Sequence, residues 1–331
     1  MSERYLVTGG LGFIGSHLVD AIIARGDEVV ILDALSWGSS VDHVPRMPVV
    51  GGGALHRIGE LPRGSCVVVG DVADAELARV LAALTHAGYH LAAQTHVDRS
   101  YGDVMPFAVS NAVGSASVLQ AYREAGKRLV YVSTDEVYGD CWEGSYQESQ
   151  PLAPRNVYSA LKAAGDLLAQ NFALLFGVDV VIARPSNNYG PRQFPEKLVP
   201  RIATDVLAGR QFPIFGDGGQ ERDWVWVGDT VAALLALMER GTSGRVYNIG
   251  VHQHRTVRAV AERICSILGA RFEDHVEHVE DRVRGDRRYS LDSSRIQAEV
   301  GWAPTKTFDA GIVETVEWYR RRCAAPGGAS P

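Results

Sequence analysis

The chain has 331 residues, 46% of them hydrophobic and 22% charged, and its formal net charge at pH 7 is −6. A chain of this length forms one large domain or two closely joined ones, and the composition is that of an ordinary soluble enzyme. The acidic balance, without a run of basic residues, argues against nucleic acid or a membrane surface as a partner. No uninterrupted apolar stretch reaches the roughly 18 residues of a membrane span.

The four cysteines lie far apart, without the close pairing of zinc ligands or redox motifs: Cys66, Cys141, Cys265 and Cys323. This spacing predicts neither a metal site nor a disulfide framework, and it fits a reducing compartment. The first predicted strand begins close to Met1, so we expect no signal peptide. We therefore expect a cytoplasmic protein without a bound metal.

Short apolar runs alternate with amphipathic stretches through the first half of the chain. The runs predict strands at residues 4–9, 28–33, 66–71, 89–93, 128–133 and 178–184. The stretches predict helices at residues 15–25, 74–84, 107–125 and 157–176. This alternation predicts an α/β fold with a doubly wound parallel sheet, and valine-rich runs suit strands that are buried on both faces.

The sequence pattern changes after Arg184, where prolines interrupt the alternation of apolar runs and amphipathic stretches. We predict a sheet domain over residues 1–184 and a smaller α/β substrate-binding lobe over 185–222 and 251–323. A predicted helix and strand within residues 223–250 return to the sheet domain, so the two parts are interleaved.

Two further segments are predicted to be irregular. Residues 38–64 are rich in glycine and proline and predict a surface excursion. The final residues, 324–331, predict a disordered tail.

The first predicted strand leads into TGGLGFIGSHL (residues 8–18), where Gly9, Gly12 and Gly15 open a helix. Glycine is needed because the backbone turns tightly and must approach a pyrophosphate, which the free N–H groups of the helix then bind. Asp33 ends the next predicted strand, where a carboxylate accepts hydrogen bonds from ribose hydroxyls and repels a 2′-phosphate. The motif predicts a dinucleotide-binding (Rossmann) domain that uses NAD rather than NADP.

The segment YSALK (158–162) places Tyr158 and Lys162 four residues apart, on one face of a predicted helix. A lysine near a phenol, beside a cationic nicotinamide, favours the phenolate and lowers a pKa that is normally about 10. Such a tyrosine can take a proton from a sugar hydroxyl while a hydride leaves the same carbon. Together with the glycine motif, this pair predicts a dehydrogenase-type active site.

Two adjacent carboxylates, Asp135 and Glu136, follow Ser133 and Thr134 at the end of a predicted strand. A single carboxylate at such a position is usually a turn residue or a helix cap. Two neighbouring carboxylates in a closed site do not both ionise easily, so one can act as an acid while the other acts as a base. The pair therefore suggests acid–base chemistry in addition to hydride transfer.

The motifs together resemble those of the extended short-chain dehydrogenase/reductases that act on nucleotide sugars, and most closely those of the dTDP-glucose 4,6-dehydratases. Epimerases and decarboxylases of this superfamily share the glycine motif and YxxxK but generally lack the Asp-Glu pair, so that pair favours a dehydratase. The segments that carry the resemblance are AAQTHVDRS (92–100), STDEVYGD (133–140), RPSNNYGPRQFPEKLVPR (184–201), PIFGDGGQERDWVWVGD (213–229) and DRRYSLD (286–292).

The resemblance implies conversion of dTDP-glucose to dTDP-4-keto-6-deoxyglucose in three steps. Tyr158, with Thr134 and Lys162, assists oxidation of C4 by NAD. Glu136 removes the proton at C5, and Asp135 protonates the hydroxyl that leaves C6. The hydride then returns to C6, so the cofactor is regenerated in each turnover.

The resemblance also implies two sets of contact residues. Those for NAD are Gly9, Gly12, Phe13, Ile14, Gly15, Asp33, Asp71, Val72, Leu91, Ala92, Ala93, Ser110, Val132, Tyr158, Lys162 and Asn187. Those for the nucleotide sugar are Thr95, Asn187, Glu196, Lys197, Leu198, Pro213, Phe215, Arg222, Asn248 and Arg287, with Ile214 near the base. Arginine suits this second set because its planar fork matches phosphate oxygens.

The helices at 107–125 and 157–176 carry more small and apolar residues than one face of a sheet needs. The additional small residues are Ala108, Ala112, Ser115, Ala160, Ala163 and Ala164. In the family that the chain resembles, the matching helices form a four-helix interface between two subunits. The resemblance therefore implies a homodimer.

Several segments depart from the dTDP-glucose pattern and leave other substrates open. Gln94 and Thr95 look more like the UDP-glucose dehydratases, the segment ALSWGSS after Asp33 is unusual, and Arg284 and Gly285 resemble epimerases and decarboxylases. The alternatives are the same reaction or a 5,6-elimination on UDP-glucose or UDP-N-acetylglucosamine, and then a 4-epimerase. The remaining alternative is a non-catalytic NAD-sensing protein, but such proteins typically lose the residues that correspond to Tyr158 or Lys162.

Overall fold

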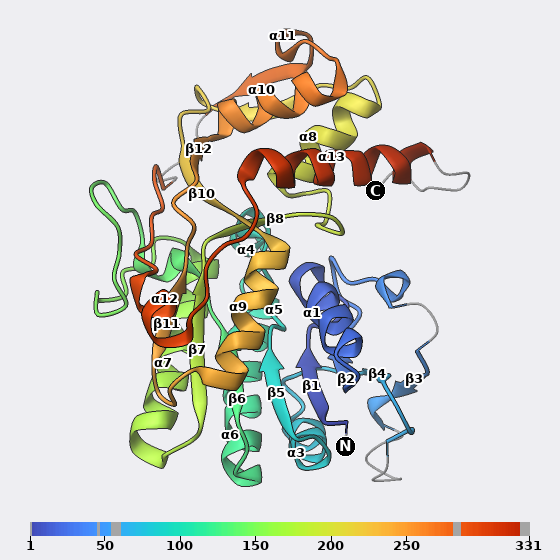
Figure 1. Cartoon of the computed structure of the whole chain (residues 1–331), viewed down its shortest axis with the longest axis vertical. Helices are drawn as coiled ribbons and strands as arrows, with labels where there is room; N and C mark the ends of the chain where they lie inside the picture. The colour runs from blue at the N-terminus through green and yellow to red at the C-terminus, as the bar shows by residue number, and fades with distance from the viewer. Residues whose placement is uncertain (1, 45–46, 54–60, 281–285, 325–331) are drawn as a thin grey trace.

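The computed structural model describes residues 2–44, 47–53, 61–280 and 286–324, and its centre is a large parallel sheet (Figure 1). Within the described residues this sheet has eight strands in the order β11-β7-β6-β5-β1-β2-β4-β3. All neighbouring pairs run parallel. The strands are β1 (Arg4–Thr8), β2 (Glu28–Asp33), β3 (Val49–Gly51), β4 (Cys66–Val69), β5 (Ala87–His90), β6 (Leu129–Val132), β7 (Val180–Pro185) and β11 (Val246–Ile249).

The order of the strands reverses between β1 and β5, because the chain builds outward from β1 first on one side and then on the other. This is the doubly wound arrangement, in which ligands bind beyond the carboxyl ends of the strands at the reversal. The fold class predicted from the alternating pattern is therefore confirmed.

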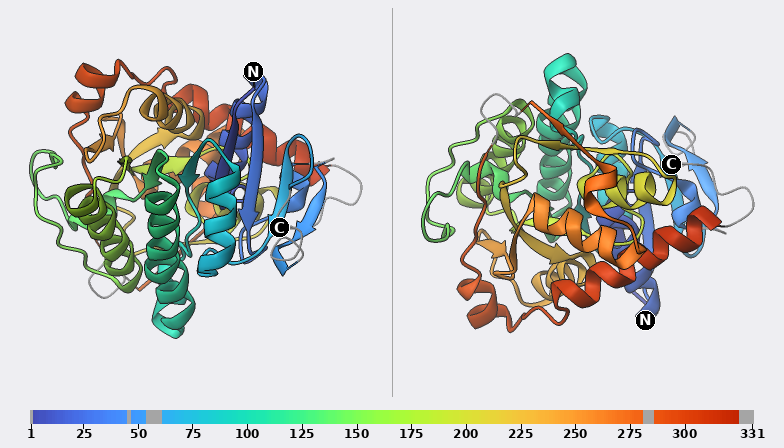
Figure 2. Two further views of the ribbon diagram at one scale, coloured as in Figure 1. Left: turned by 90° about the horizontal axis from the view of Figure 1, so that it is seen from below. Right: turned by 90° about the horizontal axis from the view of Figure 1, so that it is seen from above.

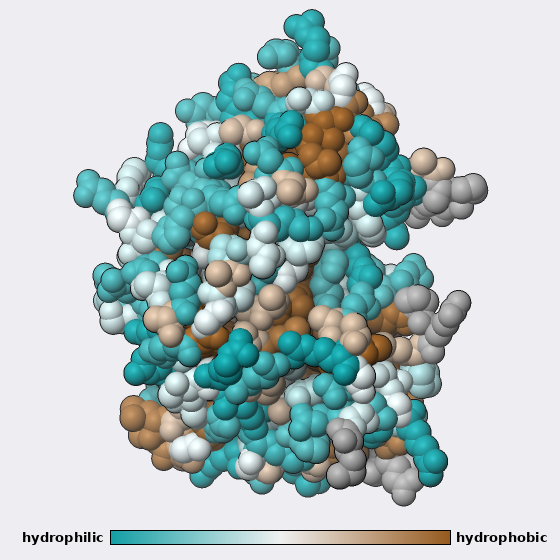
Figure 3. Space-filling view, in the orientation of Figure 1, coloured by the Kyte–Doolittle hydropathy of each residue, from teal (hydrophilic) through white to brown (hydrophobic). Residues whose placement is uncertain are grey.

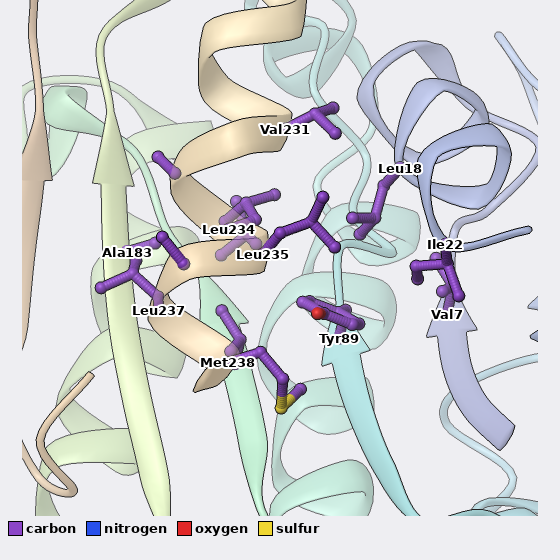
Figure 4. Packing of buried hydrophobic residues seen from close by; sticks show 14 of the residues in the cluster. Val7, Leu18, Ile22, Tyr89, Ala183, Val231, Leu234, Leu235, Leu237 and Met238 are labelled. Carbon is purple, nitrogen blue, oxygen red and sulfur yellow. The ribbon is translucent and has the colours of Figure 1, made fainter. Parts of the chain in front are cut away.

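Helices cover both faces of the sheet (Figure 2). On one face α1 and α9 pack against it, and their apolar side chains meet those of β1, β5 and β7 (Figure 4). On the other face α3, α6 and α7 bury a second cluster. Successive strand residues, such as Leu6 and Val7, point to opposite faces and so enter different clusters. The helices are α1 (Phe13–Ala24), α3 (Ala75–Leu84), α6 (Gly114–Ala125), α7 (Val157–Phe176) and α9 (Val227–Arg240).

The helical stretch predicted at 107–125 is wider in its first part than an α-helix. It consists of α5 (Met105–Ala108), a π-helical turn η2 (Val109–Val113) and α6. Asn111, in the wide turn, accepts a hydrogen bond from the backbone N–H of Gln94 at 2.8 Å and donates to its carbonyl oxygen at 3.0 Å. Such turns often occur at functional sites, and this one adjoins the cavity described below.

The predicted irregular excursion at 38–64 is wrong in part. It contains a short 3₁₀ turn, η1 (Val41–His43), and the strand β3, whose Val49 and Val50 pair with Val67 and Val68 of β4. Three residues next to Pro48 are too few to show a strand pattern, although they form the edge of the sheet. Residues 45–46 and 54–60 of this segment lie outside the described part, as do 325–331 of the predicted tail.

The lobe sits above the carboxyl ends of the large sheet (Figure 1). It has a mixed sheet of β8 (Asn187–Tyr189), β10 (Glu221–Trp226) and β12 (His254–Thr256) and a parallel pair of β9 (Phe212–Phe215) and β13 (Val276–Val279). A separate apolar cluster joins these strands to helices. The helices are α8 (Leu198–Leu207), α10 (Val257–Leu268), α11 (Phe272–His275) and α13 (Phe308–Ala324).

The remaining short helices, α4 (Val97–Gly102) and α12 (Ser294–Val300), lie beside the sheet domain. The face seen in Figure 3 is mainly hydrophilic, with hydrophobic residues in separate patches. Among the helices of the described ranges, none is both long enough and apolar enough to cross a membrane. The boundaries of the two parts stay our proposal from the sequence.

Candidate active site

A cavity of about 670 Å³ opens where the sheet domain meets the lobe. Its floor is formed by the loops that follow β1, β2, β4, β5 and β6, and its roof by residues 185–197. This is the position at which a doubly wound sheet binds its ligand, and the volume suits a cofactor together with a substrate.

The loop after β1 has the backbone shape that the glycine motif predicts. Gly9 has a φ of +68°, and a Cβ atom there would lie 2.8 Å from the backbone of Ala92. A Cβ atom at Gly15 would lie 2.2 Å from the carbonyl oxygen of Gly9, so larger residues cannot be accommodated without moving the loop. Gly12 is the N-cap of α1, and the amino end of this helix faces the cavity. The loop is therefore shaped for the close approach of an anionic group.

The carboxylate of Asp33 is held in place at the end of β2. Its oxygens accept hydrogen bonds from the backbone N–H groups of Leu11, at 3.1 Å, and Leu35, at 3.0 Å. Burial raises the pKa of Asp33, and these hydrogen bonds oppose that rise. The side chain is thus fixed in the wall of the cavity, where it can accept hydrogen bonds from the hydroxyls of a ribose.

Every residue predicted to contact NAD lines this cavity, from the glycine loop to Asn187. Three lining residues, Ser133, Asn187 and Gln193, each keep a buried oxygen that has no hydrogen-bond partner among the described residues. Buried polar atoms are normally paired, so these three oxygens fit a bound molecule that carries hydrogen-bond donors. The cradle of glycines, the fixed carboxylate and the unpaired oxygens together fit a dinucleotide.

Tyr158 and Lys162 lie in the first turns of α7, and both side chains line the cavity. The ammonium group of Lys162 donates to the carbonyl oxygen of Val132 at 2.8 Å and lies 5.1 Å from the centre of the Tyr131 ring. Burial lowers the pKa of Lys162 to about 8. The lysine is therefore held against β6, about one helical turn along α7 from the catalytic tyrosine that the sequence predicts.

The prediction that Lys162 and a cationic nicotinamide lower the pKa of Tyr158 includes the bound cofactor and stays a prediction, while the protein alone acts on this pKa in the other direction. Burial raises the pKa of Tyr158 well above 10, and the charge of Glu136 adds to this rise. The hydroxyl of Thr134 opposes it by a hydrogen bond. The sequence pattern placed Lys162 near the phenol, but it could not show that two carboxylates face the same phenol. A phenolate here needs a further positive charge in the cavity.

Asp135 and Glu136 form the start of a 3₁₀ turn, η3 (Asp135–Tyr138), that follows β6. Asp135 accepts hydrogen bonds from the hydroxyls of Ser186, at 2.6 Å, and Thr134, at 3.1 Å. Burial raises its pKa to about 7, and the charge of Glu136 also acts in this direction. Glu136 accepts from the side-chain amide of Asn156 at 3.0 Å. The two carboxylates thus lie in one cavity with different partners, and the raised pKa favours the protonated form of Asp135 over a wider pH range than is usual for an aspartate.

A buried polar network joins the strand β7, the helix α7 and the turn η3. The guanidinium group of Arg184 (β7) donates to both oxygens of Asp166 (α7), at 2.8 and 2.6 Å, and to the hydroxyl of Tyr138 (η3) at 2.6 Å. Arg184 and Asp166 are 1% and 0% exposed. The network therefore fixes the turn that carries the two carboxylates against the helix that carries Tyr158.

The structure does not bring Asn248 to the cavity. The residue is fully buried in β11, where its Oδ1 accepts from Tyr138 and its Nδ2 donates to the carbonyl oxygens of Tyr146 and Asp292. All of the polar atoms of its amide are thus engaged by the protein. Asn248 extends the polar network, and the geometry gives it no contact with a substrate.

The other residues predicted to hold the nucleotide sugar are divided between two places. Thr95, Asn187, Glu196 and Lys197 line the main cavity, and Lys197 donates to the carbonyl oxygen of Thr95 at 2.8 Å. The rest do not line it: Leu198 begins α8, Pro213, Ile214 and Phe215 lie in β9, Arg222 lies in β10, and Arg287 lines a smaller cavity of about 180 Å³. Ile214 is buried in the apolar cluster of the lobe.

Arg222 and Arg287 lie close to each other although neither lines the main cavity. Arg222 donates to the backbone oxygens of Asp286, at 2.7 Å, and Arg287, at 3.2 Å, and its guanidinium lies 4.4 Å from the centre of the Tyr289 ring. The segment just before, which includes Arg284 and Gly285, lies outside the described residues. The role of these arginines in phosphate binding stays a prediction.

Sequence reasoning missed several residues of the cavity. Ser186 donates to Asp135, and Trp37 and Phe194 pack against each other with ring centres 5.0 Å apart. The indole N–H of Trp37 donates to Glu196, which the sequence had assigned to the substrate. A signal for Trp37 existed, because it lies in the segment ALSWGSS that departs from the dTDP-glucose pattern.

The comparison with known families agrees with this geometry. The family model described as GDP-mannose 4,6 dehydratase matches residues 6–315. The chain belongs to this family. A dTDP-glucose 4,6-dehydratase from Streptomyces niveus is 43% identical over 324 residues, which cover 96% of the chain and 93% of that relative.

Two solved structures, one of a dehydratase and one of an epimerase, are similar to this chain over nearly its whole length. The dTDP-glucose 4,6-dehydratase of Streptomyces venezuelae, with NAD bound, has a TM-score of 0.88 and 38% identity, over 96% of this chain and 97% of that one. The UDP-glucose 4-epimerase of Thermotoga maritima has a TM-score of 0.85 and 30% identity, over 97% and 99%. Dehydratases and epimerases thus share the fold, and the choice between them depends on the residues of the site.

Proposed function

We propose that the protein is an NAD-dependent nucleotide-sugar 4,6-dehydratase that converts dTDP-glucose to dTDP-4-keto-6-deoxyglucose. The observation that carries this proposal is the pair of carboxylates, Asp135 and Glu136, in the same cavity as Tyr158 and Lys162. A 4-epimerase needs the tyrosine and the lysine but gives the two carboxylates no task. Two relatives that are 43% and 41% identical to this chain are named for the dehydratase reaction.

Each residue has a separate role in this reaction. Tyr158 accepts the proton of the C4 hydroxyl, and Thr134 holds the oxygen beside it. Lys162 orients the phenol from behind. When bound, NAD supplies a positive ring that favours the Tyr158 phenolate, and it accepts the hydride from C4 and returns it to C6.

The ketone at C4 makes the hydrogen on C5 acidic, and the carboxylates then complete the elimination. Glu136 takes this hydrogen as a proton, and the electron pair of the C5–H bond forms the C5–C6 double bond. The C6–O bond breaks as Asp135 gives its proton to the departing hydroxyl, which leaves as water. Asp135 suits this step because burial raises its pKa to about 7, so that a large fraction of the group still holds a proton near neutrality.

The proposal is tested by giving the purified protein dTDP-glucose, UDP-glucose and UDP-N-acetylglucosamine in turn and identifying the products by NMR. We expect a 4-keto-6-deoxy product from dTDP-glucose, formed faster than from either UDP-sugar. Formation of the C4 epimer without loss of water would contradict the dehydratase. A faster reaction with a UDP-sugar would support the proposed dehydration but would show that the substrate carries UDP instead of dTDP. A cytoplasmic location stays a prediction from the sequence.

The first prediction concerns the cofactor. The purified protein should carry NAD or NADH without any being added, because the nicotinamide is regenerated in each turnover and the cavity encloses it. Asp33→Ala should weaken NAD binding about tenfold or more, because a charged acceptor for the ribose hydroxyls is lost. Calorimetric titration of the stripped protein measures this, and Asp42→Ala, which changes an exposed carboxylate nearby, is the control. A preference for NADP in the unchanged protein would contradict the role of Asp33.

The second prediction concerns assembly. We propose a homodimer through the helical stretch α5-η2-α6 and through α7, because these elements present apolar side chains to solvent: Met105 (α5), Val113 (η2) and Leu167 (α7) are 65%, 51% and 48% exposed. Of the small residues expected there, Ser115 and Ala163 are buried within the subunit, so they cannot contact a partner.

Sedimentation should show a dimer at micromolar concentration, and Leu167→Glu should shift it toward monomer by placing a charge in the interface. Val313→Glu, which changes an exposed valine on α13, should leave the dimer intact. A monomeric parent protein would exclude this assembly.

A further inference from the structure

The side-chain amide of Asn156 joins the two catalytic elements. Its Oδ1 accepts a hydrogen bond from the backbone N–H of Ser159 at 2.8 Å, which makes Asn156 the N-cap of α7. Its Nδ2 donates to Oε2 of Glu136 at 3.0 Å. The helix cap requires the oxygen at one end of the amide, so the nitrogen must point at the carboxylate. One side chain thus holds both the Tyr158 helix and Glu136.

Helix capping alone does not account for an asparagine at this position. Serine and aspartate cap helices about as well as asparagine does. Aspartate has no donor in its ionised side chain, and the single hydroxyl of serine lies at the capping position, one bond short of the amide nitrogen that donates to Glu136. The feature that asparagine adds at position 156 is therefore the donor that faces the carboxylate.

Glu136 lies in surroundings that otherwise disfavour its charge. Burial raises the pKa of Glu136, and the hydrogen bond from Asn156 is the largest influence that opposes this rise. The charges of Lys197 and Arg222 also oppose it, whereas that of Asp286 adds to it. The titratable groups that face Glu136 from its own turn, from α7 and from the lobe side are Asp135, Tyr158, Lys197, Arg222, Asp286 and Tyr289.

We propose that Asn156 is a positioning residue for the dehydration: it keeps Glu136 ionised and directed into the cavity, and it thereby sets the pH range in which the C5 proton is removed. This inference rests on the proposed function, because Glu136 has a proton to remove only if a 4-keto sugar is formed. Asn156 acts through Glu136 and does not touch the reacting atoms.

The test uses Asn156→Ser, because serine keeps the helix cap and removes the amide N–H group that donates to Glu136. Two rates are measured with dTDP-glucose between about pH 5 and about pH 9, a range that spans carboxylate titration in a buried site. The first is the appearance of NADH absorbance in a single turnover, which reports oxidation of C4. The second is the exchange of the C5 hydrogen with deuterated solvent, which reports the base.

We expect the acid limb of the exchange rate to move upward by about one pH unit in Asn156→Ser, because a hydrogen bond to a charged group is lost. Exchange below that limb should fall about tenfold, with the plateau at higher pH retained. Oxidation of C4 should change less than about twofold, because Tyr158, Lys162 and the cap remain. Asn156→Asp should move the limb further, since it places a carboxylate beside Glu136.

An exchange profile of Asn156→Ser that coincides with the parent profile would overturn the inference. An equal fall of oxidation and exchange at every pH would also overturn it and would leave Asn156 as a cap alone. Asn156→Ala, which removes both the cap and the donor, shows the size of that structural effect. A parent protein that oxidises none of the three sugars would overturn the proposed function itself, and this inference with it.

Discussion

Replacement of Tyr158 by phenylalanine should slow the oxidation of C4 by about 10²–10⁴-fold, because the group that accepts the hydroxyl proton is lost. The phenol lies within the cavity at the start of α7, and phenylalanine keeps its ring and its packing. The rate is measured as NADH absorbance in a single turnover with dTDP-glucose. A variant that oxidises C4 at near the parent rate would exclude Tyr158 as the base of this step.

Replacement of the two carboxylates should spare the oxidation of C4 and block the later elimination of water. Glu136→Gln and Asp135→Asn leave Tyr158 and Lys162 in place, so both variants should still form NADH and then fail to complete the elimination. Glu136→Gln should abolish exchange of the C5 hydrogen with solvent, and Asp135→Asn should mainly slow the loss of water from C6. Dehydration at the parent rate in both variants would leave the pair as turn residues and would assign the acid and the base of the elimination to other groups.

The pH dependence follows from Asp135, whose pKa burial raises to about 7. This carboxyl group must hold a proton to act as the acid, and it loses that proton as the pH rises through this value. Elimination should therefore fall about tenfold for each pH unit above about 7. Asp135→Asn cannot ionise, so its slow residual elimination should lack this alkaline limb. Loss of water is followed by mass spectrometry of the product.

Replacement of Arg184 by methionine should lower the free energy of unfolding by about 3–5 kcal/mol, because it leaves the carboxylate of Asp166 buried without its partner. Both side chains are almost fully buried, and three hydrogen bonds of the guanidinium group are lost. Urea unfolding measures the change. Arg245→Met is the matched control, because its ion pair with Glu299 is partly exposed and should contribute only ~0–1 kcal/mol.

The double variant Arg184→Met and Asp166→Leu distinguishes the cost of an unpaired buried charge from the cost of poorer packing. Removal of both charges should restore most of the stability, since no charge then remains buried. A single variant that loses less than about 1 kcal/mol would mean that water or another group solvates Asp166.

The parts of the site that the sequence could predict are those whose chemistry requires a short, local pattern. Gly9, Gly12 and Gly15 are fixed by the path of one loop, and Tyr158 and Lys162 by one turn and a half of helix. The sheet was predictable for the same reason, because each buried strand is a short apolar run. The strand β3 was not, because three residues at an edge show no periodicity.

Other features depend on contacts between distant parts of the chain. Ser186 reaches Asp135 across 51 residues, and Trp37 reaches Glu196 across 159. No local pattern marks either pair. The place of Asn248 depends on the pairing of β11 with β7, which decides whether its amide meets a ligand or the hydroxyl of Tyr138. The pKa of Tyr158 likewise reflects Asp135 and Glu136, which approach it only in the folded chain.

The hydrogen bond between Tyr138 and Asn248 has a consequence for synthesis of the chain. The catalytic turn leaves the ribosome 110 residues before Asn248 does, which takes on the order of 5–20 s at ordinary rates of translation. Once β7 has emerged, and until β11 follows it, β7 is an unpaired edge of the sheet. The nascent chain thus exposes a strand with unpaired backbone N–H and C=O groups, next to a candidate site that still lacks part of its polar network. Growing chains of this protein should therefore depend on chaperones until β11 has emerged.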